Sequence, residues 1–195
     1  MTKIITITGD LGSGKSTVSN LLCERLKYEY IYTGKIQREI AARHNMTTLE
    51  LNHYAETHPE IDDEIDSTFK SLNGATDLIV DSRLAWFFIP NSLKVYLKTD
   101  LMVSVSRISD DLQRENEKYS SKDEAVNKII ARKTSENKRY RELYGADCSD
   151  LTNFNLVIDT SFIIPERVAD IILAEYHQWL VSQECSKSFV DPANL

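Results

Sequence analysis

Short apolar segments rich in β-branched residues alternate along the chain with longer segments in which apolar residues recur every three or four positions. The short segments predict five β-strands, at residues 3–8, 28–32, 77–81, 92–98 and 153–159. The longer segments predict helices at residues 17–26, 35–43, 59–72, 100–107, 122–144 and 165–184, with another opening at Thr47. Gly34 is expected to break the chain before the second helix. This alternation is typical of a parallel α/β sheet with helices on both faces.

A glycine-rich turn joins the first predicted strand to the first predicted helix. Residues 9–16 are GDLGSGKS and fit G-x-x-x-x-G-K-[ST], the pattern of a phosphate-binding loop. Lys15 can reach the β- and γ-phosphates of a nucleotide, and the Ser16 hydroxyl can coordinate Mg²⁺. Asp10 is unusual in this loop, because a carboxylate beside a triphosphate is unfavourable unless it points away. The flanking strand and helix favour a nucleotide site over a chance match.

Composition and charge narrow the classes of partner. The chain has 195 residues and no apolar run that could span a bilayer, which favours one globular domain and no membrane partner. Its net charge of −7 argues against binding nucleic acid polymers. Cationic residues gather at positions 132–141, which suits a small phosphate-bearing ligand. The three cysteines are widely spaced, and the N-terminus leaves no room for a signal peptide, so we expect a cytoplasmic protein. We also expect a monomer.

Carboxylates and arginines near predicted strand ends are the candidates for chemistry. Asp81 ends an apolar strand and would lie near Mg²⁺, or would simply cap a turn. Arg83 follows at the edge of the sheet where ligands bind in open α/β folds. Arg38 could reach an acceptor phosphate or could be a surface charge beside Glu39 or Asp62.

One predicted helix carries Arg132, Glu136 and Arg139 on a single face. These residues form either a solvated face with internal ion pairs or a lid. A lid of this kind would bring two guanidinium groups onto phosphates and exclude water from the reaction.

Four further segments, read with the phosphate-binding loop, resemble a known family. They are TGKIQRE at 33–39, DSRLA at 81–85, the run from Arg132 to Asp147 with R-x-x-x-E-x-x-R-Y, and FNLVIDTS at 154–161. These segments are similar to those of the nucleoside monophosphate kinases, and within them the compact, archaeal-type cytidylate kinases. They occur in the family's order, and the resemblance covers about residues 3–175.

The resemblance implies a fold and a reaction. The expected reaction is transfer of the γ-phosphoryl group of ATP to CMP or dCMP, with Mg²⁺ as cofactor. The expected fold is the P-loop NTPase fold, with a parallel sheet of strand order 2-3-1-4-5. A single domain would cover residues 1–185, with an acceptor-binding insert at about 35–75 and a lid at about 109–139. A polar tail would cover residues 186–195.

The resemblance also implies roles for individual residues. The ATP-binding residues would be Gly9, Gly12, Ser13, Gly14, Lys15, Ser16, Thr17 and Arg107. The acceptor-binding residues would be Thr33, Gly34, Arg38, Arg83, Glu136 and Arg139. The catalytic residues would be Lys15, Arg83, Arg132 and Arg139, and the metal would be held by Ser16 and Asp81.

Departures from the family pattern leave the acceptor open. Leu84 stands where larger bacterial relatives carry an aspartate, Ser82 replaces a glycine, and Gln37 replaces an aromatic residue. One alternative is a P-loop kinase for another small acceptor, such as UMP, AMP, shikimate or dephospho-coenzyme A. The other alternative is a nucleotide-binding regulatory protein without transferase activity.

Overall fold

The structure, a computed structural model, describes residues 2–46, 50–51, 54, 57–110 and 121–188. Its five strands are all parallel and lie in the order β2-β3-β1-β4-β5. They are β1 (Ile4–Gly9), β2 (Glu29–Tyr32), β3 (Leu78–Asp81), β4 (Leu93–Lys98) and β5 (Leu156–Asp159). The predicted fold class and strand order are therefore confirmed.

Helices connect these strands. The connecting elements are α1 (Lys15–Leu26), α2 (Thr33–Arg43), α4 (Glu60–Ser71), α5 (Ala85–Phe88), α6 (Leu101–Asp110), α7 (Lys122–Tyr144), the 3-10 turn η2 (Leu151–Asn153) and α8 (Pro165–Ser188). The helix predicted to open at Thr47 falls on a stretch of which residues 47–49, 52–53 and 55–56 lie outside the described part. Helix α8 continues to Ser188, beyond the predicted start of the polar tail.

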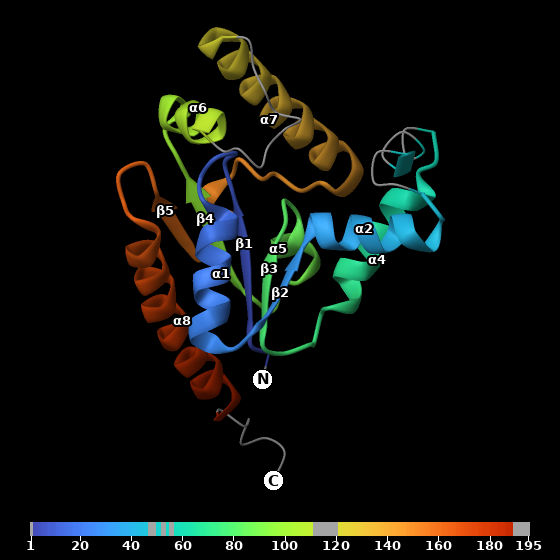
Figure 1. Cartoon of the computed structure of the whole chain (residues 1–195). Helices are drawn as coiled ribbons and strands as arrows, with labels where there is room; N and C mark the ends of the chain where they lie inside the picture. The colour runs from blue at the N-terminus through green and yellow to red at the C-terminus, as the bar shows by residue number, and fades with distance from the viewer. Residues whose placement is uncertain (1, 47–49, 52–53, 55–56, 111–120, 189–195) are drawn as a thin grey trace.

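Alternate residues of each strand enter two different cores, one on each face of the sheet. Ile5 and Ile7 of β1 pack with α1 and α8, which lie side by side across one face (Figure 1). Ile4, by contrast, packs with α2, α4 and α5 on the other face. Burial of both faces explains why the strands are near-continuous runs of apolar residues.

One local expectation was wrong, and one short helix was not predicted. Gly34 does not break the chain, because it lies in the first turn of α2, which begins at Thr33. A Cβ atom at Gly34 would lie 3.3 Å from the Tyr32 ring, so a side chain here would require the ring to shift by a few tenths of an ångström. The short helix α5 was not predicted, because four residues are too few to show a helical period and three of them are buried.

The carboxyl end of the sheet is where the functional elements gather. Figure 1 shows α7 lying beyond the carboxyl ends of the strands, with α2 and α4 to one side. Leu11 of the phosphate-binding loop packs against a small apolar core that includes Val105 of α6 and Ile129 of α7. Among the described helices, none is long and apolar enough to cross a membrane.

Candidate active site

The phosphate-binding loop is held in place by main-chain contacts. A Cβ atom on Gly9 would lie 2.1 Å from the carbonyl oxygen of Leu97, so only glycine allows β1 to approach β4 this closely. Gly14, at φ +83°, leads into α1, whose N-terminus opens at Lys15. The Lys15 ammonium donates to the carbonyls of Gly9 (3.2 Å) and Asp10 (2.7 Å). The loop therefore presents a cation and a helix N-terminus at one place, as an anion site requires.

The Asp10 carboxylate has its partners on β4, on the segment after β4 and on α7. It accepts hydrogen bonds from the Tyr96 hydroxyl (2.9 Å) and the Thr99 N–H (3.1 Å), and it pairs with Lys133 at 2.6 Å. Burial raises the pKa of Asp10, but Lys133, Thr99 and Tyr96 together outweigh burial and hold the pKa below its ordinary value. These partners stabilise the charged carboxylate, so Asp10 can lie in a phosphate-binding loop.

Asp81 and Ser16 bring two oxygen donors together at the end of β3. The Ser16 hydroxyl lies 3.5 Å from Asp81 Oδ2, and the Tyr30 hydroxyl donates to the same oxygen at 3.1 Å. Burial raises the pKa of Asp81, partly offset by the positive charge of Lys15. A carboxylate and a hydroxyl beside the phosphate loop are hard oxygen ligands, which fit a cation such as Mg²⁺.

A cavity of about 590 Å³ extends from the phosphate-binding loop to α4. Its lining includes seven of the predicted site residues: Lys15, Thr33, Gly34, Asp81, Arg83, Glu136 and Arg139. These residues come from α1, α2, β3 and the segment after it, and α7, so the fold brings together segments that lie far apart in the sequence.

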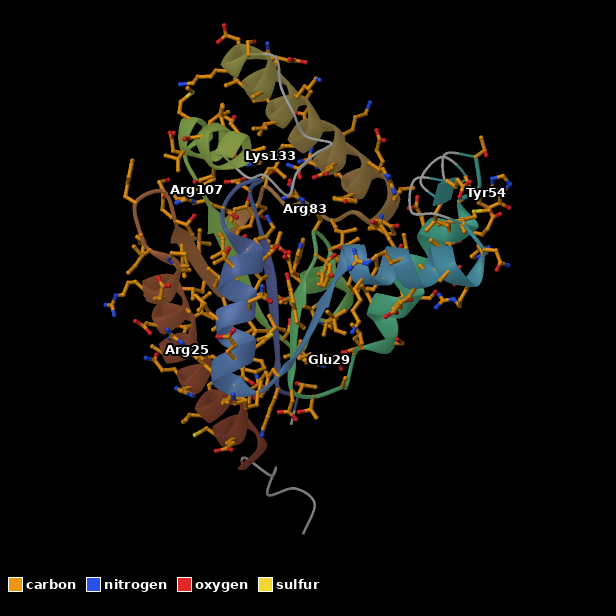
Figure 2. All side chains as sticks on the ribbon, viewed as in Figure 1. Arg25, Glu29, Tyr54, Arg83, Arg107 and Lys133 are labelled. Carbon is orange, nitrogen blue, oxygen red and sulfur yellow. The ribbon has the colours of Figure 1, made fainter. Side chains whose placement is uncertain are left out.

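Three ion pairs connect successive turns of α7 to the rest of the site. Lys133 pairs with Asp10, Glu136 with Arg83 at 3.0 Å, and Arg139 with Asp62 of α4 at 2.7 Å. Figure 2 shows Arg83 and Lys133 at the carboxyl end of the sheet beneath α7. Three charged side chains of α7 therefore have partners outside the helix, in the loop, after β3 and in α4.

Three of the predicted arginines are not part of this cavity lining. Arg38 donates to the Tyr32 hydroxyl, and its guanidinium lies 5.3 Å from the Tyr32 ring centre. Arg107 donates to the carbonyls of Gly12 (3.2 Å) and Thr160 (2.7 Å), so it braces the loop against the segment after β5. Arg132 lies in α7, and its side chain is outside the described part.

Several cavity residues were missed by sequence reasoning. They include Asp66 and Phe69 of α4, Phe88 of α5, and Tyr144 of α7. In the sequence, Ile61, Ile65 and Phe69 give α4 an ordinary apolar stripe, and nothing there marks a second use for the same face. Asp66 flanks that stripe, and this is the one signal that could have drawn notice to it.

The fold and the phosphate-binding loop define a P-loop kinase. Shikimate kinase from Bacteroides thetaiotaomicron has the same fold, with a TM-score of 0.60 at 16% identity, covering 87% of this chain and 98% of that one. Shikimate kinase from Acinetobacter baumannii superposes with a TM-score of 0.55 at 18% identity, covering 94% and 95%.

Sequence comparison defines the family within this class. The chain belongs to the cytidylate kinase-like family, which matches residues 4–162. It is 39% identical over 172 residues to the cytidylate kinase of Sulfolobus acidocaldarius, covering 87% of this chain and 91% of that protein. It is 41% identical over 163 residues to that of Methanococcus maripaludis strain C5, covering 81% and 88%.

Proposed function

We propose that this protein is an ATP-dependent cytidylate kinase, which transfers the γ-phosphoryl group of ATP to CMP or dCMP and releases ADP. The observation that carries the proposal is the single cavity joining Lys15 of the phosphate-binding loop to Arg83 and Arg139. The names of its relatives support the choice of acceptor over shikimate, whose kinases share only the fold.

The donor site would be the phosphate-binding loop. Main-chain N–H groups from Gly9 to Thr17, with Lys15 and the N-terminus of α1, would hold the ATP phosphates, and Arg107 would lie on the donor side. Ser16, and Asp81 through water, would hold Mg²⁺, which neutralises charge on the β- and γ-phosphates when it is bound.

The acceptor site would be the rest of the cavity. Arg83 and Arg139, with Arg38 and Arg132, would contact phosphate oxygens, while Thr33, Gly34 and Glu136 would help hold the acceptor nucleotide. An acceptor phosphate oxygen attacks the γ-phosphorus in line as the bond to the ADP oxygen breaks, so no side chain need act as nucleophile. The residues supply positioning and positive charge.

The ion pairs of α7 give this proposal a specific binding step. Arg83 would exchange Glu136 for phosphate oxygens, and Arg139 would likewise exchange Asp62. Helix α7 would then cover the reacting phosphates and exclude water. We further propose that the protein works in the cytoplasm, because its three cysteines are free, and that it is a monomer.

ADP release from ATP and Mg²⁺ tests the proposal, with CMP, dCMP, UMP, AMP, GMP, shikimate or no acceptor. Release that depends on CMP or dCMP, and that is lost in Lys15→Ala, is the expected result. Release with a different acceptor would keep the phosphate chemistry and reassign the acceptor site. ATP binding without release on any acceptor would instead indicate a regulatory protein.

A further inference from the structure

Contacts made by successive residues of α7 show which parts of the cavity lie near the phosphate-binding loop and which lie near α4. Lys133 contacts the loop, Glu136 contacts Arg83, and Arg139 contacts Asp62 of α4. Tyr144, the last residue of the helix, contacts Asp66 one turn further along α4. At 1.5 Å per residue, Tyr144 lies roughly 16 Å beyond Lys133 along the helix axis. Asp66 therefore lies at the end of the cavity away from the phosphate-binding loop.

This far end has the walls of a site for a flat ring. Ile65 and Phe69 of α4 line the cavity together with Phe88 of α5 and Tyr144. The rings of Phe88 and Tyr144 meet edge to face, with centres 5.4 Å apart. Such apolar and aromatic walls bury the faces of a nucleobase favourably, and they leave its polar edge to be matched by a small number of polar groups.

Asp66 is the polar group at this end that lacks a full set of partners. Its side chain is buried, with 7% of the residue exposed, and it lines the cavity. Oδ2 accepts a hydrogen bond from the neutral Tyr144 hydroxyl. Among the described residues, no donor reaches Oδ1 and no cation pairs with either oxygen. A buried carboxylate with one neutral partner is costly, unless a ligand supplies the missing donor.

The other carboxylates of the cavity already have charged or hydrogen-bonding partners. Asp62 and Glu136 are paired with Arg139 and Arg83, the two arginines proposed to bind phosphate. Asp81 contacts Ser16, at the end nearest the phosphate-binding loop. Asp66 is therefore the carboxylate placed to meet the base of a nucleotide whose phosphate lies on the arginines.

We infer that Asp66 selects the acceptor base by accepting a hydrogen bond from the exocyclic amino group of cytosine. This inference rests on the proposed function. Cytosine carries an amino group at C4, which is a donor, whereas uracil carries a carbonyl oxygen there. A carboxylate facing that carbonyl would set two acceptors against each other, so Asp66 favours CMP or dCMP over UMP.

Asp66→Asn tests the inference by changing what this side chain offers. The Tyr144 hydroxyl can still donate to the amide oxygen, which leaves the amide N–H₂ facing the base. We expect kcat/KM for CMP to fall roughly tenfold or more while kcat/KM for UMP stays or rises, because one charge-assisted hydrogen bond is lost. Asp63→Asn is the matched control, since it removes the same charge from an exposed position on the same helix. It should leave the CMP-to-UMP ratio unchanged.

A substrate analogue gives a second test that requires no variant. The ribonucleoside monophosphate of 2-pyrimidinone is CMP with hydrogen in place of the amino group. The unmodified protein should use it roughly tenfold or more less efficiently than CMP. Asp66→Asn, if its thermal melting shows that it folds, should discriminate less between the two.

The outcomes separate this inference from the proposed function. If Asp66→Asn lowers kcat/KM for CMP and UMP equally, or if the analogue matches CMP in the unmodified protein, Asp66 has a structural role and the inference is wrong although the kinase assignment stands. If the unmodified protein phosphorylates neither CMP nor dCMP, the proposed function fails, and the inference fails with it.

Discussion

The two ends of the cavity are built in different ways. At one end, the phosphate-binding loop occupies consecutive residues, and its cation, Lys15, hydrogen-bonds to carbonyls of its own loop. At the other end, Asp66, Phe88 and Tyr144 come from three helices and meet only in the folded chain. In the proposed complex the loop would contact phosphates, which every nucleotide shares, whereas the far end would contact the base, which differs between nucleotides. The loop residues proposed to bind phosphate are thus neighbours in the sequence, whereas the residues proposed to select the acceptor come together only through tertiary packing.

The largest effect should follow removal of the cation at the local end. Lys15→Ala should lower turnover with CMP about a thousandfold or more, because this charge stabilises the transferring phosphoryl group. Coupled measurement of ADP release checks this, with Lys3→Ala as a control for loss of a surface lysine. Thermal melting should be nearly unchanged, and near-normal turnover would contradict the kinase assignment.

The second-largest effect concerns the backbone of the phosphate-binding loop, where Gly9 has no room for a side chain. Gly9→Ala should lower the free energy of unfolding by about 3 kcal/mol or more, since its Cβ would overlap the Leu97 carbonyl. Gly74→Ala is the matched control, because Gly74 also has a positive φ but open space around it, and should cost only about 1 kcal/mol. Denaturant unfolding of both variants measures the difference, and equal losses would mean that β1 can move away from β4.

A smaller effect, on the use of the acceptor alone, should follow loss of an arginine that lies between the two ends of the cavity. Arg139→Ala should raise KM for CMP about tenfold and leave KM for ATP nearly unchanged, because this guanidinium lines the acceptor part of the cavity. Steady-state kinetics with each substrate varied in turn provides the measurement. Arg141→Ala is the control, since Arg141 pairs with Asp147 instead. An equal rise in both KM values would mean that Arg139 serves donor and acceptor alike.

The smallest effect concerns stability and pH. Because contacts hold the pKa of folded Asp10 below its unfolded value of 3.8, the carboxylate stabilises the fold above that value and loses its contribution as pH falls through the folded pKa. Asp10→Asn should therefore lower the free energy of unfolding by about 1 kcal/mol at pH 7 and by less below pH 3.8. Unfolding curves at several pH values test this, and a pH-independent difference would point to packing rather than charge.

The sequence predicted best the features that depend on neighbouring residues. The five strands, the helix from Lys122 to Tyr144 and the phosphate-binding loop all show a local period or a fixed spacing, and the structure places each of them within a few residues. The strand order was predicted through the family resemblance, and it is also correct.

Features that depend on distant contacts were not predicted. Gly34 was predicted to break the chain before a helix, whereas it lies in the first turn of α2, close to the Tyr32 ring. Glu136 and Arg139 of α7 were recognised as candidates, but their partners Arg83 and Asp62 are set by how α7 lies over the carboxyl ends of the strands. Asp66 was passed over although it flanks the apolar stripe of α4, since a carboxylate in an amphipathic helix usually faces water.

The ion pairs along α7 mean that the site contains its own counter-ions. Glu136 and Asp62 occupy the arginines that a phosphate would need, so a stray inorganic anion must displace an internal competitor to bind any one of them. A nucleotide can displace several at once and keep its other contacts while each exchange occurs, which favours multidentate ligands. The proposed acceptor site would thus disfavour small inorganic anions without excluding them by size.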